Sequence, residues 1–324
     1  MRVKRKSSIL PQAMGIAIVT IALLSLAMLL RLKSVADIYQ TSHEVADVEN
    51  MQPTVDTVIA SDQANGSAIS EFTPNEGTAK NLYVHGTASD TNGCSDITGV
   101  SVWVFHYPTM PQEPLPLDNN SVYMVTSTVS GCAGANDNDV AYAVTIPIAS
   151  YADPTDAGSP YESEHWTALV QVHDPDRDNM SLTTFELNSL AAFDTDSSVN
   201  YGVIGLGGIS TEQTVTFTNK GNRQVDATVV ATSTHNGDMY SDLTGFADIP
   251  ASAVHYSLLQ GFVYGVRDMA VSNTEPASFA IHLPAQTDDQ APAPQVPTYW
   301  LLKMPESGVK GNYTNTLNFT AVAN

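Results

Sequence analysis

The chain has 324 residues, which is enough for two domains of ordinary size. It carries 34 acidic but only 13 basic side chains, and the first 33 residues hold six of the basic ones and no acid. From residue 34 onward, a surface with so few cations repels nucleic acid at ordinary salt concentrations, so no nucleic-acid partner is expected. Apolar residues make up 43% of the chain, which supplies real cores and excludes a disordered acidic tail.

The N-terminus has the pattern of a membrane anchor. Residues 1–33 combine a basic tip with an apolar run, and the eighteen uncharged residues 13–30 would span roughly 27 Å as a helix. Arg31 and Lys33 close this run, but the larger positive cluster precedes it. The charge asymmetry predicts a single-pass signal anchor in the cell membrane, with the N-terminus in the cytoplasm and residues 34–324 outside.

Two other fates of the N-terminus stay open. Ser34 and Ala36 are small residues at the positions that a signal peptidase reads, so cleavage before Asp37 would release a secreted protein. A prepilin-like leader would also pair an apolar N-terminal helix with a β-rich head. The usual pilin junction of a small residue, apolar residues and a glutamate is missing here.

After a helical extension or stalk at 34–53, the sequence changes to short runs rich in Val, Ile, Thr, Tyr and Phe, separated by Gly, Asn, Asp and Pro. This texture predicts an all-β protein. A first sandwich is expected over 54–193, with Trp103 or Trp166 near its centre, and a second over 199–324. The strands expected in the first are 54–61, 82–88, 98–106, 121–128, 140–148, 166–173 and 180–187. Those expected in the second are 199–204, 213–218, 225–232, 253–258, 278–283, 298–303 and 312–322, with an exposed loop at 284–297.

Several turn-and-strand motifs carry a family resemblance. They are Tyr201-Gly202, Gly207-Gly208, Gln213 to Asn222 and Gly308 to Thr314, with a weaker version in Val84 to Gly93 followed by Ile97 to Val104. With them the chain resembles the immunoglobulin-like sandwich modules of bacterial and archaeal surface proteins. The resemblance implies two tandem immunoglobulin-like β-sandwiches at the cell surface, and it transfers no catalytic residue.

Cys94 and Cys132 are the only cysteines, 38 positions apart. An even count outside the cytoplasm predicts one disulfide. With immunoglobulin-like strand order, the loops 89–97, 129–139 and 174–179 emerge at one end of the first sandwich. Because one cysteine lies in each of the first two loops, strand order and disulfide support each other.

The same three loops concentrate negative charge. They hold seven carboxylates: Asp90, Asp96, Asp137, Asp139, Asp174, Asp176 and Asp178. A hard cation with oxygen ligands would relieve their repulsion, and the alternate spacing at 174–178 is typical of calcium loops. We therefore weigh a calcium ion that rigidifies this end against a solvated acidic tip without metal. No other cofactor is expected.

Catalytic patterns are missing. None of the eight histidines has metal-site spacing, and no nucleophile elbow or phosphate-binding glycine loop occurs. The closest acid–base cluster is Glu162, Glu164 and His165. The sequence therefore predicts no catalytic residue and no enzyme.

The expected function is a structural or adhesive role at the envelope, with other envelope proteins or surface polysaccharide as partners. One alternative is a carbohydrate-binding module, in which exposed rings would stack on sugars. The candidate tyrosines are Tyr107, Tyr151, Tyr161, Tyr240, Tyr256, Tyr264 and Tyr299. The other alternative is a pilin-like filament subunit, which would need one continuous helix from residue 13 to 50.

Overall fold

The computed structural model describes residues 47–324 except 107–117, 135, 242–246, 288 and 309. The expected anchor at 1–33 and most of the stalk at 34–53 lie outside the described residues. Residues 47–53 form neither helix nor strand, so the helical stalk is wrong for this part of it. None of the described residues belongs to a helix that could cross a bilayer.

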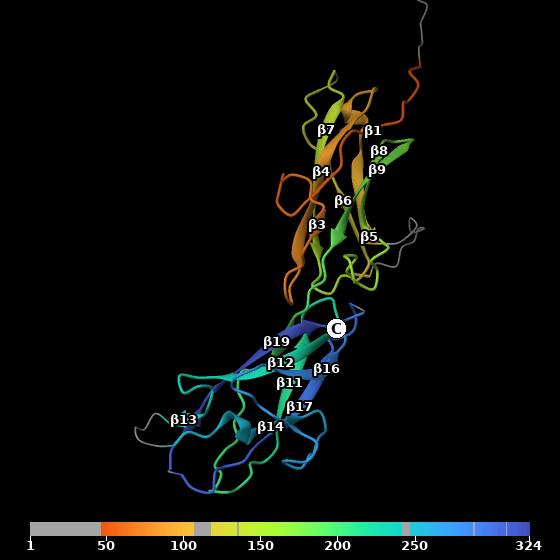
Figure 1. Ribbon diagram of the computed structural model, residues 1–324. Helices are drawn as coiled ribbons and strands as arrows, with labels where there is room; N and C mark the ends of the chain where they lie inside the picture. The colour runs from red at the N-terminus through yellow and green to blue at the C-terminus, as the bar shows by residue number, and fades with distance from the viewer. Residues whose placement is uncertain (1–46, 107–117, 135, 242–246, 288, 309) are drawn as a thin grey trace, which may run out of the picture. The chain divides into compact units, whose positions relative to one another are not determined.

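The described residues form strands, loops and two short 3-10 helices (Figure 1). The first half contains β1 (Thr54–Val55), β2 (Ile59–Ser61), β3 (Glu71–Phe72), β4 (Lys80–Ser89), β5 (Gly99–His106), β6 (Val122–Ser127), β7 (Asp139–Ile148), β8 (Trp166–His173) and β9 (Asp178–Leu187). A 3-10 turn, η1 (Cys94–Asp96), precedes β5. All seven strands expected here are found, to within two residues at most ends, and β3 is an addition.

These strands make two sheets around one core. β7 and the path β1-β4-β2 form one sheet, and β3-β9-β8-β5-β6 form the other. Alternate residues of β7 are buried, as period-2 alternation predicts. They meet the buried residues of β4, β5, β8 and β9 in one apolar cluster that includes Trp166. Trp103 instead belongs to a small separate cluster with Phe105, Val122 and Leu169.

The strand expected at 54–61 is interrupted by a bulge. The N–H groups of Asp56 and Thr57 both donate to the carbonyl oxygen of Thr87, at 3.0 and 3.2 Å. Between the pairs Val55–Ala88 and Ile59–His85, the segment that joins β1 to β2 contains one residue more than the facing part of β4. Gly86 permits this close approach, because a Cβ atom there would lie 2.0 Å from the Thr57 carbonyl oxygen.

The second half has three sheets. Its strands are β10 (Phe193–Thr195), β11 (Gln213–Asn219), β12 (Val225–Thr232), β13 (Tyr240–Ser241), β14 (Val254–Ser257), β15 (Met269–Ala270), β16 (Ala277–Leu283), β17 (Gln295–Leu302), β18 (Tyr313–Thr314) and β19 (Thr316–Ala323). The 3-10 turn η2 (Ala251–Ala253) precedes β14. The sheets run β10-β11-β17-β14-β15, β16-β12-β19 and β13-β18. A second apolar cluster centres on Phe217, Phe279 and Trp300.

Four expectations need correction in this half. The strand expected at 312–322 is split into β18 and β19, which pair with β13 and β12 in different sheets. Residues 199–204 form no strand, because Gly202 takes a positive φ and breaks the extended run. The expected loop 284–297 ends early, since β17 already begins at Gln295. β10 already pairs with β11, although the second sandwich was expected to start only at Val199. The boundaries of the two domains stay a prediction.

Candidate functional site

The three acidic loops of the first half do meet at one end. Ser89 at the end of β4 pairs with Asp139 at the start of β7, and His173 at the end of β8 pairs with both Gly99 and Asp178. Cys94 and Cys132 form a disulfide there, with Cα atoms 5.5 Å apart. We call this end, with loops 89–97, 129–139 and 174–179, the acidic tip.

The aspartates of the acidic tip mostly organise their own loops. Asp90 Oδ1 accepts a hydrogen bond from Asn92 N at 2.7 Å, and Asp174 Oδ1 accepts one from Asp176 N, also at 2.7 Å. Asp137 accepts from the backbone N–H groups of Ala133 and Asp139. Such side-chain to backbone bonds are characteristic of Asx turns.

The remaining aspartates have simpler surroundings. Asp178 accepts from Gln171 Nε2 and pairs with His173 Nδ1, both at 2.8 Å. Asp139 and Asp176 are exposed, and Asp96 is half-buried.

These hydrogen bonds set the ionisation of two loop carboxylates. Donation from the backbone N–H groups of Ala133 and Asp139 lowers the pKa of Asp137. Burial alone would raise the pKa of Asp174, but the N–H groups of Asp176 and Arg177 outweigh it and lower that pKa. Both carboxyls are therefore held in the charged form that the turns need.

Among the described residues, no three His, Cys, Asp or Glu side chains come together in a way that could hold a metal ion. Two oxygens of the acidic tip, Asp90 Oδ2 and Asp174 Oδ2, are buried without a hydrogen-bond partner in the described part of the chain. Calcium binding here stays a prediction.

The segment that leads into the first sandwich is fastened to the acidic tip. We call residues 50–55 the entry segment. Met51 N donates to Asn92 Oδ1 at 2.6 Å, and β1 then pairs with β4. On the opposite sheet, Gln52 Nε2 donates to the Asp178 carbonyl oxygen, and Asn179 Nδ2 donates to the Pro53 carbonyl oxygen. The entry segment thus ties together both sheets of the sandwich.

At the other end of β5, His106 lies between two carboxylates. Its Nε2 is 3.0 Å from Asp153 Oδ2, its Nδ1 is 2.9 Å from Glu164 Oε2, and its side chain is only 4% exposed. Burial alone would lower the pKa of His106, but the hydrogen bonds and charges of Asp153 and Glu164 raise it. The rings of Tyr161 and Trp166 pack against the imidazole.

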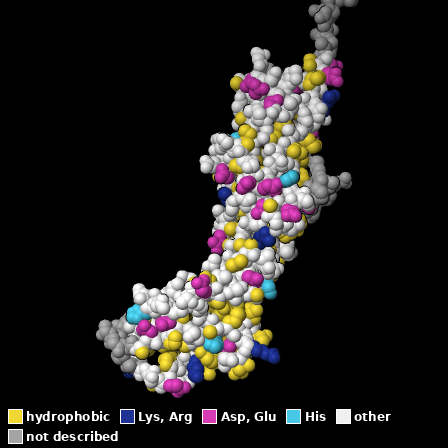
Figure 2. Space-filling model, in the orientation of Figure 1, with side chains coloured by type: hydrophobic (Ala, Val, Ile, Leu, Met, Phe, Trp, Pro, Cys, Tyr) yellow, Lys and Arg dark blue, Asp and Glu magenta, His cyan; other side chains and the backbone are white. Residues whose placement is uncertain are grey.

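The acid–base cluster expected at 162–165 is split between separate partners. Glu164 binds His106, while His165 pairs with Glu186 and Glu162 accepts from Gly158 N. Most described histidines are paired in the same way, which the sequence did not indicate. The further pairs are His173–Asp178, His235–Asp248, His255–Asp268 and His282–Asp226. Contacts between histidine and carboxylate are thus frequent in a chain with few Lys and Arg, whose surface shows many scattered carboxylates (Figure 2).

Four of the tyrosines expected in loops pack against other aromatic rings. Tyr256 lies in β14 and is fully buried against Phe279 and Trp300. Tyr240 and Tyr264 stack on His235 and His255, Tyr161 lies tilted against a histidine ring, and Tyr299 belongs to β17. Tyr151 is half-buried, and Tyr107 lies outside the described residues. The sugar-binding alternative stays a prediction.

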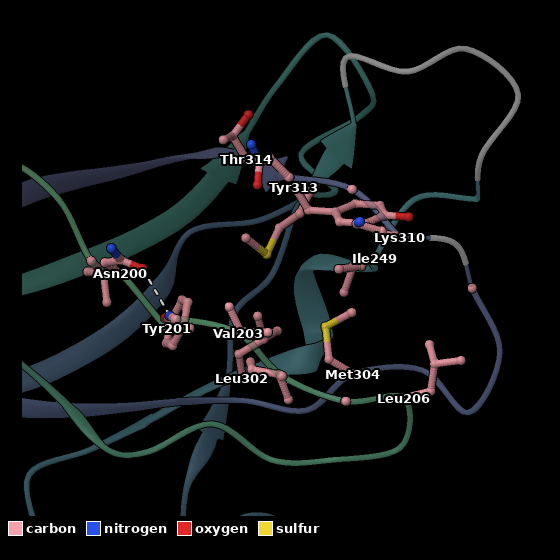
Figure 3. Close-up of a pocket in the computed structure, with 18 residues that line it drawn as sticks. Asn200, Tyr201, Val203, Leu206, Ile249, Leu302, Met304, Lys310, Tyr313 and Thr314 are labelled. Carbon is pink, nitrogen blue, oxygen red and sulfur yellow. Dashed lines mark hydrogen bonds between the residues drawn. The ribbon is translucent and has the colours of Figure 1, made fainter.

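The second half contains a pocket that the sequence did not reveal. Its cavity volume is about 760 Å³, and it lies between the segment 199–206 and the segment 308–314 (Figure 3). Met239, Ile249, Leu302 and Met304 complete the lining. The segment 199–206 is the one expected as a strand. It is held next to the end of β17, where Gly207 N donates to the Pro305 carbonyl oxygen and Met304 N donates to that of Gly208.

No protein-family model matches the chain, and no match was found among curated proteins. Several solved structures are similar. One is the chaperone–tip adhesion subunit pre-assembly complex from archaic chaperone-usher pili of Acinetobacter baumannii, at 12% identity over 81% of this chain and 99% of that one, with a TM-score of 0.34. Another is the BspA C-terminal domain of the Streptococcus agalactiae AgI/II polypeptide, at 10% identity, 84% and 96% coverage and a TM-score of 0.22.

A third similar structure is the CupB6 tip adhesin from Pseudomonas aeruginosa, at 8% identity, with 82% of this chain and 95% of that one covered and a TM-score of 0.26. All three similarities are distant, at 12% identity or less and with TM-scores of 0.34 or less. With TM-scores this low they assign neither a function nor a partner to this chain.

Proposed function

We propose that this chain is a non-catalytic, membrane-anchored cell-surface protein with a structural or adhesive role at the envelope, built from two tandem immunoglobulin-like β-sandwiches. The strand pairing of the first half supports the fold. β1, β4 and β7 share one sheet and β5, β8 and β9 share the other, as strands A, B, E and C, F, G do in immunoglobulin domains.

The observation that carries the proposal is the way in which the chain enters the first sandwich. The entry segment follows the apolar run of the N-terminus and is bonded to both sheets, next to the disulfide. A body held at this point suits attachment to a membrane through residues 13–30, and a disulfide suits an exported body. The histidines and carboxylates of the first sandwich are used in turns and structural pairs, which favours a role without catalysis.

Export can be tested with the full chain produced in a bacterial host. We expect it in the membrane fraction, with its two cysteines oxidised and residues beyond 50 cleaved by protease added to spheroplasts. Replacing Leu24 with Arg places a charge in the middle of the apolar run, at an apparent cost of about 2.5–3.5 kcal/mol for insertion. The L24R chain should stay inside the cell with reduced cysteines, and cells carrying it should lose retention on a solid surface.

Leu259→Arg is the matched control, because Leu259 is 64% exposed in the second half. It should behave like the unchanged chain in every assay. A wild-type chain that stays soluble in the cytoplasm with reduced cysteines would contradict the anchor. Correct display without any gain in surface retention would contradict the adhesive role.

Calcium at the acidic tip is a separate part of the proposal, supported by the two buried and unpartnered carboxylate oxygens, Asp90 Oδ2 and Asp174 Oδ2. Calcium at a hundredfold excess over its dissociation constant should add about 2.7 kcal/mol to the unfolding free energy, a shift of a few degrees. The measurement is thermal unfolding of the full chain with calcium, or with chelator and sodium at matched ionic strength. Asp90→Asn should abolish the shift, whereas no shift, or one that sodium reproduces, excludes the ion.

A further inference from the structure

The pocket in the second half is of ligand size, and eight of its lining residues are Val, Ile, Leu or Met. Cavities of several hundred Å³ lined by apolar side chains with a few polar groups are typical of small-molecule sites. Its apolar side chains come from segments far apart in the sequence: Val199, Val203, Ile204, Leu206, Met239, Ile249, Leu302 and Met304. Several of these residues also belong to, or pack against, the apolar core of the second half. The pocket therefore borders that core.

The charge of the lining contrasts with the rest of the chain. The lining residues that the structure describes include no Asp or Glu, although acids outnumber bases strongly over residues 34–324. Lys310 is the one charged side chain among them, and it is exposed. It has no ion-pair partner in the described part of the chain. The Lys310 ammonium therefore attracts a negatively charged group to this position, whereas most of the acidic surface repels one.

Tyr201 supplies a second polar group. Its ring lines the pocket, and its hydroxyl is buried without a hydrogen-bond partner among the described residues. Burial raises the pKa of Tyr201, so the hydroxyl keeps its proton and can donate a hydrogen bond. Tyr201 and Lys310 lie on opposite sides of the view in Figure 3, with Val203, Leu302 and Met304 between them. The lining thus offers a hydrogen-bond donor and a cation that are separated by apolar side chains.

The rim is unusually apolar for a protein surface. Val203 is fully exposed, and Leu206 is 55% exposed. Both line the pocket, so a bound apolar chain would cover surface that water now contacts.

We propose that this pocket binds an amphiphile with a long acyl chain and an anionic head group. The chain lies against Met239, Leu302 and Met304, and the head group is held by the Lys310 ammonium. A free fatty acid and an anionic membrane lipid share this chemistry. The site is independent of the proposed surface role, because its residues are not used by the anchor, the disulfide or the acidic tip.

The test is photolabelling of the full chain with a long-chain fatty acid that carries a diazirine near the end of its chain, followed by peptide mapping. We expect labelling of peptides that contain Met239, Met304 or Tyr313, competed by unlabelled dodecanoate. Lys310→Glu should reduce this labelling about tenfold at sub-saturating probe, because it sets like charges side by side. Val203→Asp should reduce it as well without disturbing the core, since Val203 is fully exposed.

Two controls isolate the pocket. Arg267→Glu makes the same charge change as Lys310→Glu at an exposed residue outside the lining, and it should leave labelling unchanged. Label on residues 13–30, the apolar run, serves as an internal reference that none of these variants should alter. The methyl ester of the probe should label the pocket less than the acid does, and Lys310→Glu should remove that difference.

A second arm distinguishes the source of the ligand. The full chain is reconstituted in vesicles whose phosphatidylglycerol carries the diazirine. Labelling of the pocket there identifies a bilayer lipid, whereas labelling by the soluble acid alone identifies a free fatty acid. Equal labelling by acid and ester, insensitivity to Lys310→Glu, label confined to 13–30, or crosslinks from the pocket to a second copy of the chain would each overturn the proposal.

Discussion

Replacing His106 with leucine should lower the free energy of unfolding by about 3–5 kcal/mol at pH values below 6.5. The imidazole is 4% exposed and separates the carboxylates of Asp153 and Glu164, which are each 21% exposed. Without it, two partly buried negative charges lose their cation and face each other. Urea unfolding followed by tryptophan fluorescence measures the change, because the Trp166 ring centroid lies 5.1 Å from that of His106.

This loss should depend on pH. The pKa of His106 is raised in the folded protein above its ordinary 6.5, so the protonated imidazole favours the folded state. The contribution is fully present below pH 6.5 and is lost as pH rises through the folded-state pKa. The difference between the wild-type chain and His106→Leu should therefore be largest in mild acid and shrink at alkaline pH.

His165→Leu is the control for an exposed pair. The His165 side chain is 61% exposed beside Glu186, and such pairs are worth less than about 1 kcal/mol. If both substitutions cost the same, or if the cost of His106→Leu is flat with pH, then the imidazole does not act as the counter-ion between Asp153 and Glu164.

Reduction of the Cys94–Cys132 disulfide should lower the unfolding free energy by about 4 kcal/mol. The bond closes a loop with a sequence separation of 38, and it restricts the unfolded chain far more than the folded one. Cys94 is also buried in the core of the first sandwich, so its release loosens the turn before β5. The measurement is the urea midpoint of the full chain with and without reductant.

The double variant Cys94→Ser, Cys132→Ser supplies the control for reductant effects. It should unfold at the midpoint of the reduced wild-type chain, and reductant should not move it further. An oxidised and a reduced chain with the same midpoint would show that the loop is already restricted in the unfolded state.

Most of the first sandwich could be predicted because its strands alternate cleanly. β7 buries every second residue along its length, and the expected span 140–148 differs from the observed strand by one residue. Strands of two residues, such as β3, β13, β15 and β18, carry too few positions for any period to show. The segment 199–204 alternates in sequence, but the positive φ of Gly202 decides its conformation.

The candidate sites were predicted less well, because their partners are distant in the sequence. His106 meets Asp153 and Glu164 across separations of 47 and 58 residues, and no local spacing indicates such a group. The aspartates of the acidic tip were found, but their use in backbone turns depends on loop geometry. The pocket joins five separate stretches of the second half, and among them only Tyr201-Gly202 and Gly308 to Thr314 were used from the sequence, as fold motifs and not as a site.

The entry segment has a mechanical consequence. β1 lies antiparallel to β4, with Thr54 opposite Ser89 and Val55 opposite Ala88, and the hydrogen bonds of such a pair run across the strands. A force that pulls the N-terminus away from the acidic tip therefore acts along β1 and strains these bonds together, in shear. The side-chain bonds of Gln52 and Asn179 share the same tension with the second sheet. A pulling force applied at the N-terminal side is thus borne by hydrogen bonds to both sheets.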